Sequence, residues 1–277
     1  MLKYTLIGHP LAHSMSPFIH QKLFEISGIN AEYNCTDISR NDFEDKISEL
    51  SMLDGFNVTI PYKTEIIPHL DILDETAERY KSVNCVHNNN GRLIGYNTDC
   101  DGFLRSLKDF PLNKNVLLLG CGGVGRMIAI EAILHGATLT IAIIEEAREI
   151  AKTLLDEISQ ISPDSNVQLI AMDEINGEFD LLINATPVGM YPKSDACPVS
   201  EKIISRCENV FDAIYNPVKT KLITTAQGLG KRAVGGMAML VLQAVKAHEI
   251  WYNGTFTTEQ IDKLIAESEQ KVEADFK

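Results

Sequence analysis

Apolar residues along this chain recur in short runs that alternate with amphipathic stretches. The first run, YTLIG at 4–8, ends at a glycine, and Ser16-Pro17 then supply an N-cap and a first helical residue, which predicts a strand followed by a helix to about Ser27. The runs AEYNCTDI and DGFNVTIP predict two further strands, with a helix over NDFEDKISELSM between them. Such alternation predicts a mainly parallel α/β sheet covered on both faces.

The pattern changes at residues 83–97, VNCVHNNNGRLIGYN, where two short strands flank Asn-Asn-Gly, a strong hairpin signal. It then restarts at 115–120, NVLLLG, with a glycine loop, a helix to about His135 and the strand LTIAII. The runs FDLLINAT and NVFDAIY continue this second set of strands. Two domains are therefore expected, with the first ending near Asp99.

Two helices are predicted near the end of the chain. Residues 235–251, GGMAMLVLQAVKAHEIW, are apolar around most of a helical circumference, which predicts a heavily buried helix. A capped amphipathic helix is expected to open at Thr257.

The segment GCGGVG, residues 120–125, fits the dinucleotide-binding fingerprint. Gly120 allows the tight turn, Gly122 allows the backbone to approach a pyrophosphate, and Gly125 allows the helix to pack on the strand. The loop follows an apolar strand and opens a helix, so the helix N-terminus would face the pyrophosphate. A purely structural glycine turn is the alternative.

Glu145 follows the second strand of this region and lies about 20 residues beyond Gly125. A carboxylate there accepts hydrogen bonds from the ribose hydroxyls of NAD and repels the extra phosphate of NADP, so the local chemistry favours NAD. The alternative is that Glu145 and Glu146 only stabilise the start of the next helix.

Hydroxyl side chains precede the first predicted helix. Ser14 and Ser16, in GHPLAHSMSPFIH, are placed to hold a substrate carboxylate near helix amides. Simple N-capping explains Ser16 and leaves Ser14 unexplained. Three nearby histidines, His9, His13 and His20, have no acid or thiol among them in sequence, so no metal site is predicted.

Polar side chains also follow the strands of the first half. Thr59 ends a strand in NVTIPYK and Lys63 comes just after Pro61, at the edge where open α/β sheets bind ligands. Asn84 and Asp99 stand at similar positions. Each of these alone is compatible with surface or turn chemistry. Together they offer an ammonium, a carboxylate, a hydroxyl and a carboxamide, which suits a polyhydroxylated substrate.

The composition and charge of the chain limit the classes of partner that it is expected to bind. The formal charge of −13 and pI near 5.0 argue against nucleic-acid and anionic-membrane binding, and no apolar run approaches the length of a membrane span. Six scattered cysteines indicate reduced thiols and a cytoplasmic location. The expected partner is a small-molecule substrate, and the chain is expected to be a monomer or a homodimer.

These motifs, in this order, resemble the shikimate dehydrogenase family. The resemblance rests on GHPLAHSMSPFIH, FNVTIPYK, SVN, GYNTD, GCGGVGR, NATPVGM, DAIYNP and MLVLQA, which span both halves of the chain. It implies a mainly parallel α/β substrate domain, formed by residues 1–100 plus 237–277, around an inserted Rossmann-type dinucleotide-binding domain, 101–236. The implied reaction is the reversible reduction of 3-dehydroshikimate to shikimate with NADP.

The resemblance also implies roles for individual residues. It gives the catalytic pair as Lys63 and Asp99, both in contact with substrate. The substrate carboxylate is held by Ser14, Ser16 and Tyr215, and the ring hydroxyls by Thr59, Asn84, Asp99 and Gln243. For the cofactor, the resemblance implies a pyrophosphate cradle of Gly120, Cys121, Gly122, Gly123 and Val124, with Thr186, Ile214 and Gly236 near the nicotinamide. The fingerprint adds Gly125 and Glu145 to the predicted cofactor-binding residues.

Two departures from the family pattern keep alternatives open. Many members carry Asn-Arg-Thr as an NADP phosphate clamp where this chain has Ile143, Ile144 and Glu145, and the usual Asp-Gly-Leu-Gly-Met before the long helix is here residues 235–239, GGMAM. A quinate/shikimate dehydrogenase that prefers NAD is therefore the nearest alternative. A non-catalytic dinucleotide sensor belongs to a different class, and it leaves Lys63 with Asp99 unexplained. A metal-dependent hydrolase built on the histidines is a third.

Overall fold

Two β-sheets organise the computed structural model, which describes residues 1–11 and 14–275. Each sheet belongs to its own compact unit. The first unit comprises Met1–Phe103 and Leu240–Gln270, and the second comprises Leu104–Met239 and Lys271–Lys277. The first unit is thus built from two separate stretches of chain.

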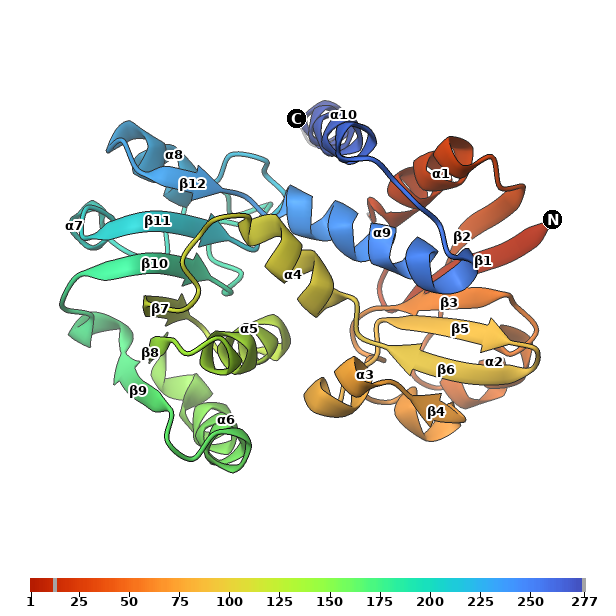
Figure 1. Cartoon of the computed structure of the whole chain (residues 1–277), viewed down its shortest axis with the longest axis horizontal. Helices are drawn as coiled ribbons and strands as arrows, with labels where there is room; N and C mark the ends of the chain where they lie inside the picture. Colours follow the sequence, from red (N-terminus) through yellow and green to blue (C-terminus); the bar gives the residue numbers. More distant parts are fainter. Residues whose placement is uncertain (12–13, 276–277) are drawn as a thin grey trace. The chain divides into compact units, whose positions relative to one another are not determined.

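The sheet of the first unit is mixed (Figure 1). Its strands, in spatial order, are β2 (Ala31–Asp37), β1 (Leu2–Gly8), β3 (Gly55–Val58), β5 (Cys85–Asn89), β6 (Arg92–Tyr96) and β4 (Ile72–Leu73). The neighbours of β1 on both sides, β2 and β3, run parallel to it, whereas β5 is antiparallel to β3 and to β6. The predicted hairpin between β5 and β6 is confirmed, because Asn90 and Gly91 both have positive φ (54° and 87°).

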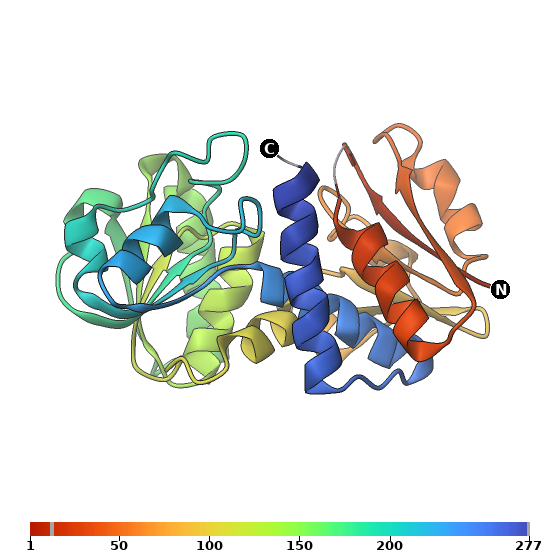
Figure 2. The same cartoon turned by 90° about the horizontal axis from the view of Figure 1, so that it is seen from above.

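Helices of the first unit connect these strands. They are α1 (Ser16–Ser27), α2 (Phe43–Leu50), the 3₁₀ turn η1 (Ile67–His69) and α3 (Glu75–Tyr80). The unit boundaries fall within α4 (Asp99–Leu107), α9 (Met237–Tyr252) and α10 (Thr258–Asp275), and most of α10 belongs to the first unit. Helix α10 runs beside α1 (Figure 2). The two helices are linked by an ion pair, with 3.4 Å between Lys22 Nζ and Glu267 Oε2. The predicted cap of α10 is confirmed, since Thr257 Oγ1 accepts from the Gln260 amide at 3.2 Å.

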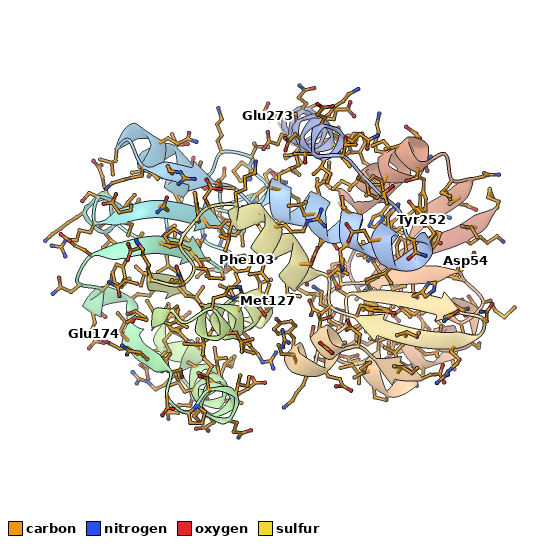
Figure 3. The ribbon with its side chains drawn as sticks, viewed as in Figure 1. Asp54, Phe103, Met127, Glu174, Tyr252 and Glu273 are labelled. Atoms are coloured by element: carbon orange, nitrogen blue, oxygen red, sulfur yellow. The ribbon has the colours of Figure 1, made fainter. Side chains whose placement is uncertain are left out.

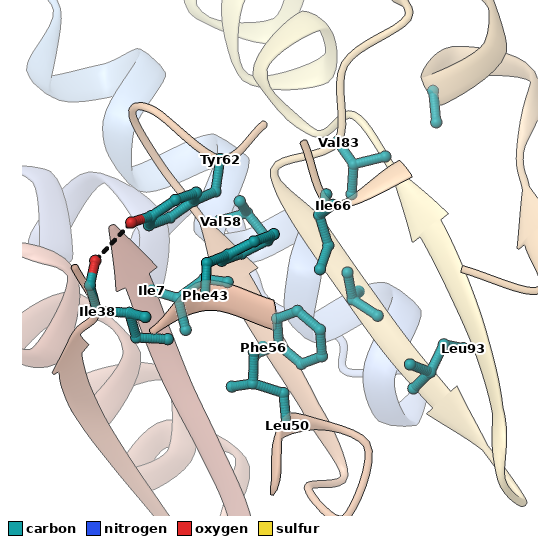
Figure 4. Close-up of a cluster of buried hydrophobic side chains, with 12 residues drawn as sticks. Ile7, Ile38, Phe43, Leu50, Phe56, Val58, Tyr62, Ile66, Val83 and Leu93 are labelled. Carbon is teal, nitrogen blue, oxygen red and sulfur yellow. Dashed lines mark hydrogen bonds between the residues drawn. The ribbon is translucent and has the colours of Figure 1, made fainter. Parts of the chain in front are cut away.

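Aromatic and aliphatic side chains fill the space between this sheet and α2 (Figure 4). The Phe43 and Tyr62 rings stack with centroids 4.2 Å apart, and Tyr62 donates its hydroxyl to the Ile38 carbonyl at 2.6 Å. Burying each such side chain contributes about 1.5–3 kcal/mol. The loop after β3, which carries Tyr62, is thereby anchored to the core.

The neighbouring strands in the sheet of the second unit run parallel to one another. Its strands, in spatial order, are β12 (Arg232–Val234), β11 (Cys207–Asp212), β10 (Phe179–Asn184), β7 (Asn115–Leu119), β8 (Thr138–Ile143) and β9 (Asn166–Ala171). The helical segments of this unit are α5 (Gly123–Leu134), η2 (Glu145–Ala147), α6 (Arg148–Ile161), η3 (Met172–Glu174), α7 (Glu201–Ile204) and α8 (Lys221–Gly228). The predicted α/β fold class, with two mainly parallel sheets, is confirmed.

Strand direction decides which residues of the first unit meet. The parallel strands β1, β2 and β3 have their carboxyl ends at one edge of the sheet. Because β5 is antiparallel to β3, with Cys85 opposite Asn57, β5 begins at that edge, and β6 returns to it at Tyr96, opposite Cys85. Residues just before β5 and just after β6 therefore lie beside the loop that follows β3.

Candidate functional site

A lysine and a carboxylate meet at this edge. Lys63 Nζ lies 2.6 Å from Asp99 Oδ2, and both side chains are largely shielded, with 25% and 19% of their side-chain areas exposed. Asn84 Nδ2 donates to the other carboxylate oxygen of Asp99, Oδ1, at 2.9 Å. Asp99 is thus held from two sides, with Lys63 at a fixed position beside it.

Asn84 is the centre of the surrounding network. It is buried, its Oδ1 accepts from the Thr98 amide at 2.7 Å, and its Nδ2 lies 3.0 Å from Thr98 Oγ1. Gln243, which reaches the network from α9, places Oε1 3.4 Å from both Asn84 Nδ2 and Thr98 Oγ1. Four of the predicted residues, Lys63, Asn84, Asp99 and Gln243, are therefore brought together. Thr98, which has no predicted binding role of its own, joins them.

The serines lie in the segment between β1 and α1. Helix α1 begins at Ser16 and its N-cap is Met15, so the prediction that Ser16 is the N-cap is wrong by one residue. It is Ser14 whose Oγ accepts from a helix amide, that of Ser16, at 3.1 Å. The capping function thus explains Ser14 rather than Ser16, whose partly buried hydroxyl stands at the start of the helix.

An aspartate that was not predicted fixes the same segment. Asp37, at the end of β2, accepts from the Leu11 amide at 2.8 Å, and its other carboxylate oxygen lies 2.6 Å from His9 Nδ1. The hydrogen bond from His9, with that from Leu11, lowers the pKa of Asp37 below its ordinary value. His9 therefore has an acidic neighbour in space although none stands near it in sequence.

Of the three histidines near the N-terminus, His9 and His20 belong to the residues that the structure describes, whereas His13 lies outside them. Among them no group of three or more His, Cys, Asp or Glu side chains could hold a metal ion. His20 instead lies buried in the core, with Nδ1 2.8 Å from Nε2 of His248. Nor is any helix in the described part of the chain long and apolar enough to cross a bilayer.

Thr59 stands directly after β3, where the chain passes close to the end of β1. A Cβ on Gly8 would lie 2.5 Å from Thr59 Cγ2, so only a glycine permits this approach. The Thr59 amide donates to the Ile7 carbonyl at 2.9 Å. The residue is thereby fixed at the carboxyl edge, on the loop that carries Lys63.

The glycine loop of the second unit follows β7. Gly120 has φ +87°, and a Cβ on Gly125 would lie 2.4 Å from the Gly120 carbonyl oxygen. A Cβ on Gly122 would meet nothing within 4 Å, and the Gly123 position is equally open. Two glycines therefore serve the turn and the helix packing, while the other two leave room for a ligand, which fits the pyrophosphate of a dinucleotide.

The remaining residues of the loop differ in exposure. Cys121 is buried, and burial raises the pKa of its thiol. Val124 is half-buried, on the first turn of α5. Neither side chain carries a charge, so a ligand at this loop would meet mainly backbone amides.

Strand β8 ends beside an acidic side chain. Ile143 is buried and Ile144 is 60% exposed. Glu145 forms a bidentate ion pair with Arg148, with 2.7 Å from Arg148 Nε to Glu145 Oε1 and 2.6 Å from Nη2 to Oε2. The hydrogen bond from Arg148 lowers the pKa of Glu145. The prediction of an acid at the end of this strand holds, and the arginine paired with it was not predicted.

The carboxyl ends of β10 and β11 are joined by a buried aspartate. Asp212 accepts from Thr220 Oγ1 at 2.6 Å, from Asn184 Nδ2 at 3.0 Å and from the Ile214 amide at 3.1 Å. Asn184 Oδ1 in turn accepts from Thr186 Oγ1 at 2.7 Å. Burial raises the pKa of Asp212 above its ordinary value. This network, absent from the sequence interpretation, positions two of the predicted cofactor residues, Thr186 and Ile214.

Gly236 and Tyr215 complete the second unit's predicted residues. A Cβ on Gly236 would lie 2.2 Å from the Ala213 carbonyl oxygen, so a glycine is required where the chain enters α9. Burial raises the pKa of Tyr215. Tyr215 belongs to the second unit, and Ser14 and Ser16 belong to the first.

A glycine loop on a parallel sheet, together with a lysine–carboxylate pair in a second α/β unit, is the arrangement of a dinucleotide-dependent oxidoreductase. The model of the shikimate dehydrogenase substrate binding domain matches residues 6–86. The shikimate dehydrogenase (NADP(+)) of Streptococcus pneumoniae is 35% identical over 277 residues, covering 96% of each chain. The chain belongs to the shikimate dehydrogenase family.

Solved structures resemble the whole chain. Shikimate 5-dehydrogenase from Thermus thermophilus, in complex with NADP(H) and shikimate, is 29% identical with a TM-score of 0.84, covering 97% of this chain and all of that one. Quinate dehydrogenase from Corynebacterium glutamicum, in complex with NAD, is 28% identical with a TM-score of 0.85, covering 96% and 99%. Both units are therefore matched, not the glycine loop alone.

Proposed function

We propose that this protein catalyses the reversible, NAD(P)-dependent reduction of 3-dehydroshikimate to shikimate. The observation that carries the proposal is the Lys63–Asp99 pair, with 2.6 Å between Nζ and Oδ2, oriented by Asn84 at the carboxyl edge of the first sheet. A sensor has no use for a shielded proton donor next to a carboxylate. Relatives of this protein are named shikimate dehydrogenase (NADP(+)), and the Lys63–Asp99 pair contains the groups that this reaction needs.

Lys63 is the proton donor and acceptor in this proposal. The nicotinamide, when bound, exchanges a hydride with the substrate carbon, and the substrate oxygen must then gain or lose a proton. The Lys63 ammonium donates that proton in the reductive direction, and Asp99 holds the ammonium in place through its Oδ2 atom. Positioned acid–base groups typically contribute about 10²- to 10⁴-fold in rate.

The remaining polar residues bind the substrate. Thr59, Asn84, Asp99 and Gln243 accept or donate hydrogen bonds to the ring hydroxyls, and the hydroxyls of Ser14, Ser16 and Tyr215 hold the carboxylate. The half-buried Ser16 hydroxyl at the start of α1 supports this role, because helix N-terminal amides favour an anion. Holding the ring rigidly makes the hydride transfer close to unimolecular.

The second unit holds the dinucleotide. The backbone of Gly120, Cys121, Gly122, Gly123, Val124 and Gly125 surrounds the pyrophosphate, Glu145 lies at the adenosine ribose, and Thr186, Ile214 and Gly236 lie on the nicotinamide side. The open space around Gly122 and the buried Asp212 network support these assignments. We accordingly assign substrate binding to the first unit and dinucleotide binding to the second, in a cytoplasmic enzyme that acts as a monomer or a homodimer.

Initial rates of oxidation of shikimate and of quinate, each with NAD and with NADP, test the proposal at the absorbance of the reduced nicotinamide. Shikimate is expected to give the higher kcat/KM with at least one cofactor. A preference for quinate would instead support the activity named for the C. glutamicum neighbour. If all four rates equal those of a Lys63→Ala control, the dehydrogenase assignment is wrong.

A further inference from the structure

A shallow pocket of about 140 Å³ opens at the carboxyl ends of β8 and β9. Its lining residues are Ile143, Ile144, Glu145, Arg148, Leu169, Ile170, Ala171 and Glu174. In dinucleotide-binding sheets the adenosine ribose lies at the end of the strand that follows the glycine-loop helix, which here is β8. NAD and NADP differ only at this ribose, where NADP carries an additional phosphate. The pocket is therefore the place where the protein can distinguish the two cofactors.

Arginine is the residue that commonly binds that phosphate, because its planar fork matches two phosphate oxygens. Arg148 is the arginine of this pocket, and its fork is occupied by Glu145 through Nε at 2.7 Å and Nη2 at 2.6 Å. A phosphate that bound to these two nitrogens would have to displace a carboxylate from the adjacent turn of chain.

Other charges around the pocket also disfavour a phosphate. Glu174, labelled in Figure 3, also lines the pocket and accepts from the Ala171 amide at 2.9 Å. On α6, the ammonium of Lys152 is paired with Glu149 at 2.7 Å. A dianionic phosphate would meet carboxylates on two sides, whereas the hydroxyls of an unmodified ribose can donate hydrogen bonds to them.

We infer that Glu145 makes this enzyme select NAD over NADP, and that Arg148 is the positioning residue which holds the Glu145 carboxylate toward the ribose. The inference rests on the proposed dinucleotide-dependent function, and it separates this chain from the relatives named for NADP(+). In this inference the Arg148 guanidinium could bind a phosphate, but its ion pair with Glu145 prevents this. Removing the carboxylate frees the fork and leaves a pocket able to accept NADP.

Direct binding of NADH and of NADPH to the purified protein, by isothermal titration calorimetry without substrate, tests this inference. The wild-type protein is expected to bind NADH at least about tenfold more tightly. In Glu145→Gln the affinity for NADPH should rise about tenfold or more, while that for NADH falls. The neutral amide lacks the negative charge with which the Glu145 carboxylate repels the phosphate and holds the Arg148 guanidinium. Adding Arg148→Gln to Glu145→Gln should abolish the gain.

Glu149→Gln is the matched control. It removes the same charge only four residues further along the chain, on the first turn of α6. In the wild type Glu149 pairs with Lys152 and does not line the pocket. Neither affinity should change by more than about twofold. Tighter binding of NADPH than of NADH by the wild type, or an equal gain for NADPH in Glu145→Gln and Glu149→Gln, would overturn the inference.

The two proposals fail in different ways. Loss of shikimate oxidation with a measured preference for NADH would reject the substrate assignment and keep the cofactor inference. Shikimate oxidation that is faster with NADP, together with tighter NADPH binding, would reject the cofactor inference alone. Absence of binding for both dinucleotides would reject both.

Discussion

The polar network around Asn84 in the first unit and the glycine loop in the second both stand at the carboxyl ends of parallel strands. They differ in what they present to a ligand. The first is composed of side chains linked to one another, with Lys63, Asp99 and Asn84 within 2.6–2.9 Å. The second presents backbone, because Gly122 and Gly123 have nothing within 4 Å of a Cβ position.

This difference separates chemistry from binding. Side chains can transfer a proton, whereas a loop that presents only backbone can bind a ligand but offers no acid or base. A side chain is tested by removing it, and a glycine loop is tested by adding a side chain. Substitutions in the first unit should therefore change the rate of the chemical step, and substitutions in the loop should change cofactor affinity or packing.

The largest effect is expected from Lys63→Ala. It should lower kcat for shikimate oxidation by about 10²- to 10⁴-fold, because the proton donor is lost, and leave dinucleotide affinity unchanged. Steady-state kinetics and dinucleotide titration measure the two effects separately. Lys46→Ala, on α2 of the same unit and paired with Glu49 at 2.8 Å, is the control and should keep full activity. A loss confined to KM would contradict a catalytic role for Lys63.

Two alanine substitutions in the glycine loop should separate binding from packing. Both Gly122→Ala and Gly125→Ala should weaken dinucleotide binding by about tenfold or more. Only Gly125→Ala should lower the unfolding free energy, by about 1–3 kcal/mol, because its Cβ would lie 2.4 Å from the Gly120 carbonyl oxygen. Calorimetric unfolding without cofactor measures this, and an equal loss of stability in Gly122→Ala would show that Gly122 is also a packing residue.

The smallest effect concerns acid stability of the first unit. Burial lowers the pKa of His20 to about 3, and burial with the neighbouring His20 lowers that of His248 well below its ordinary value. Both folded-state pKa values lie below the unfolded value near 6.5, so the unfolded chain binds more protons below that pH. Their contribution is complete above about pH 6.5 and falls as pH drops, by up to about 1.4 kcal/mol per histidine for each pH unit.

Trp251 makes this measurable, because it is the only tryptophan of the chain and it packs in the core of the first unit, near His248. Unfolding followed by Trp251 fluorescence should give lower free energies at pH 5.5 than at pH 7. His248→Phe should reduce that pH slope by about half, whatever its effect on stability at pH 7. His135→Gln, at a half-exposed side chain of the second unit, should leave the slope unchanged. An unaltered slope in His248→Phe would reject the buried pair as its source.

Local patterns predicted most of the fold. The turn at Asn90 and Gly91 needs positive φ at both residues, and few residue types adopt it, so the sequence alone located the hairpin. The glycine loop followed from spacing and context for the same reason. The start of α1 was misplaced because Ser14 and Ser16 are both suitable caps, and local rules do not decide between them.

Contacts between residues far apart in the sequence could not be predicted from local sequence patterns. His20 and His248 are 228 positions apart, and Asp37 meets His9 across 28 residues, so neither pair leaves a spacing signal. Asp212 stands in an apolar run and reads as a strand residue, although its carboxylate organises two loops. An acid or amide at the end of a strand was the only available sign, and the same sign had identified Asn84 and Asp99.

The division of the first unit into two stretches of chain determines when it can fold during synthesis. Trp251 donates its indole N–H to the Val86 carbonyl at 3.0 Å and packs against Tyr4, with ring centroids 4.3 Å apart. A nascent chain leaving the ribosome therefore lacks this part of its N-terminal core until α9 has been translated. The second unit, almost entirely contiguous over Leu104–Met239, has emerged by then and can fold first. For most of translation, the N-terminal sheet therefore exposes apolar surface that α9 later covers.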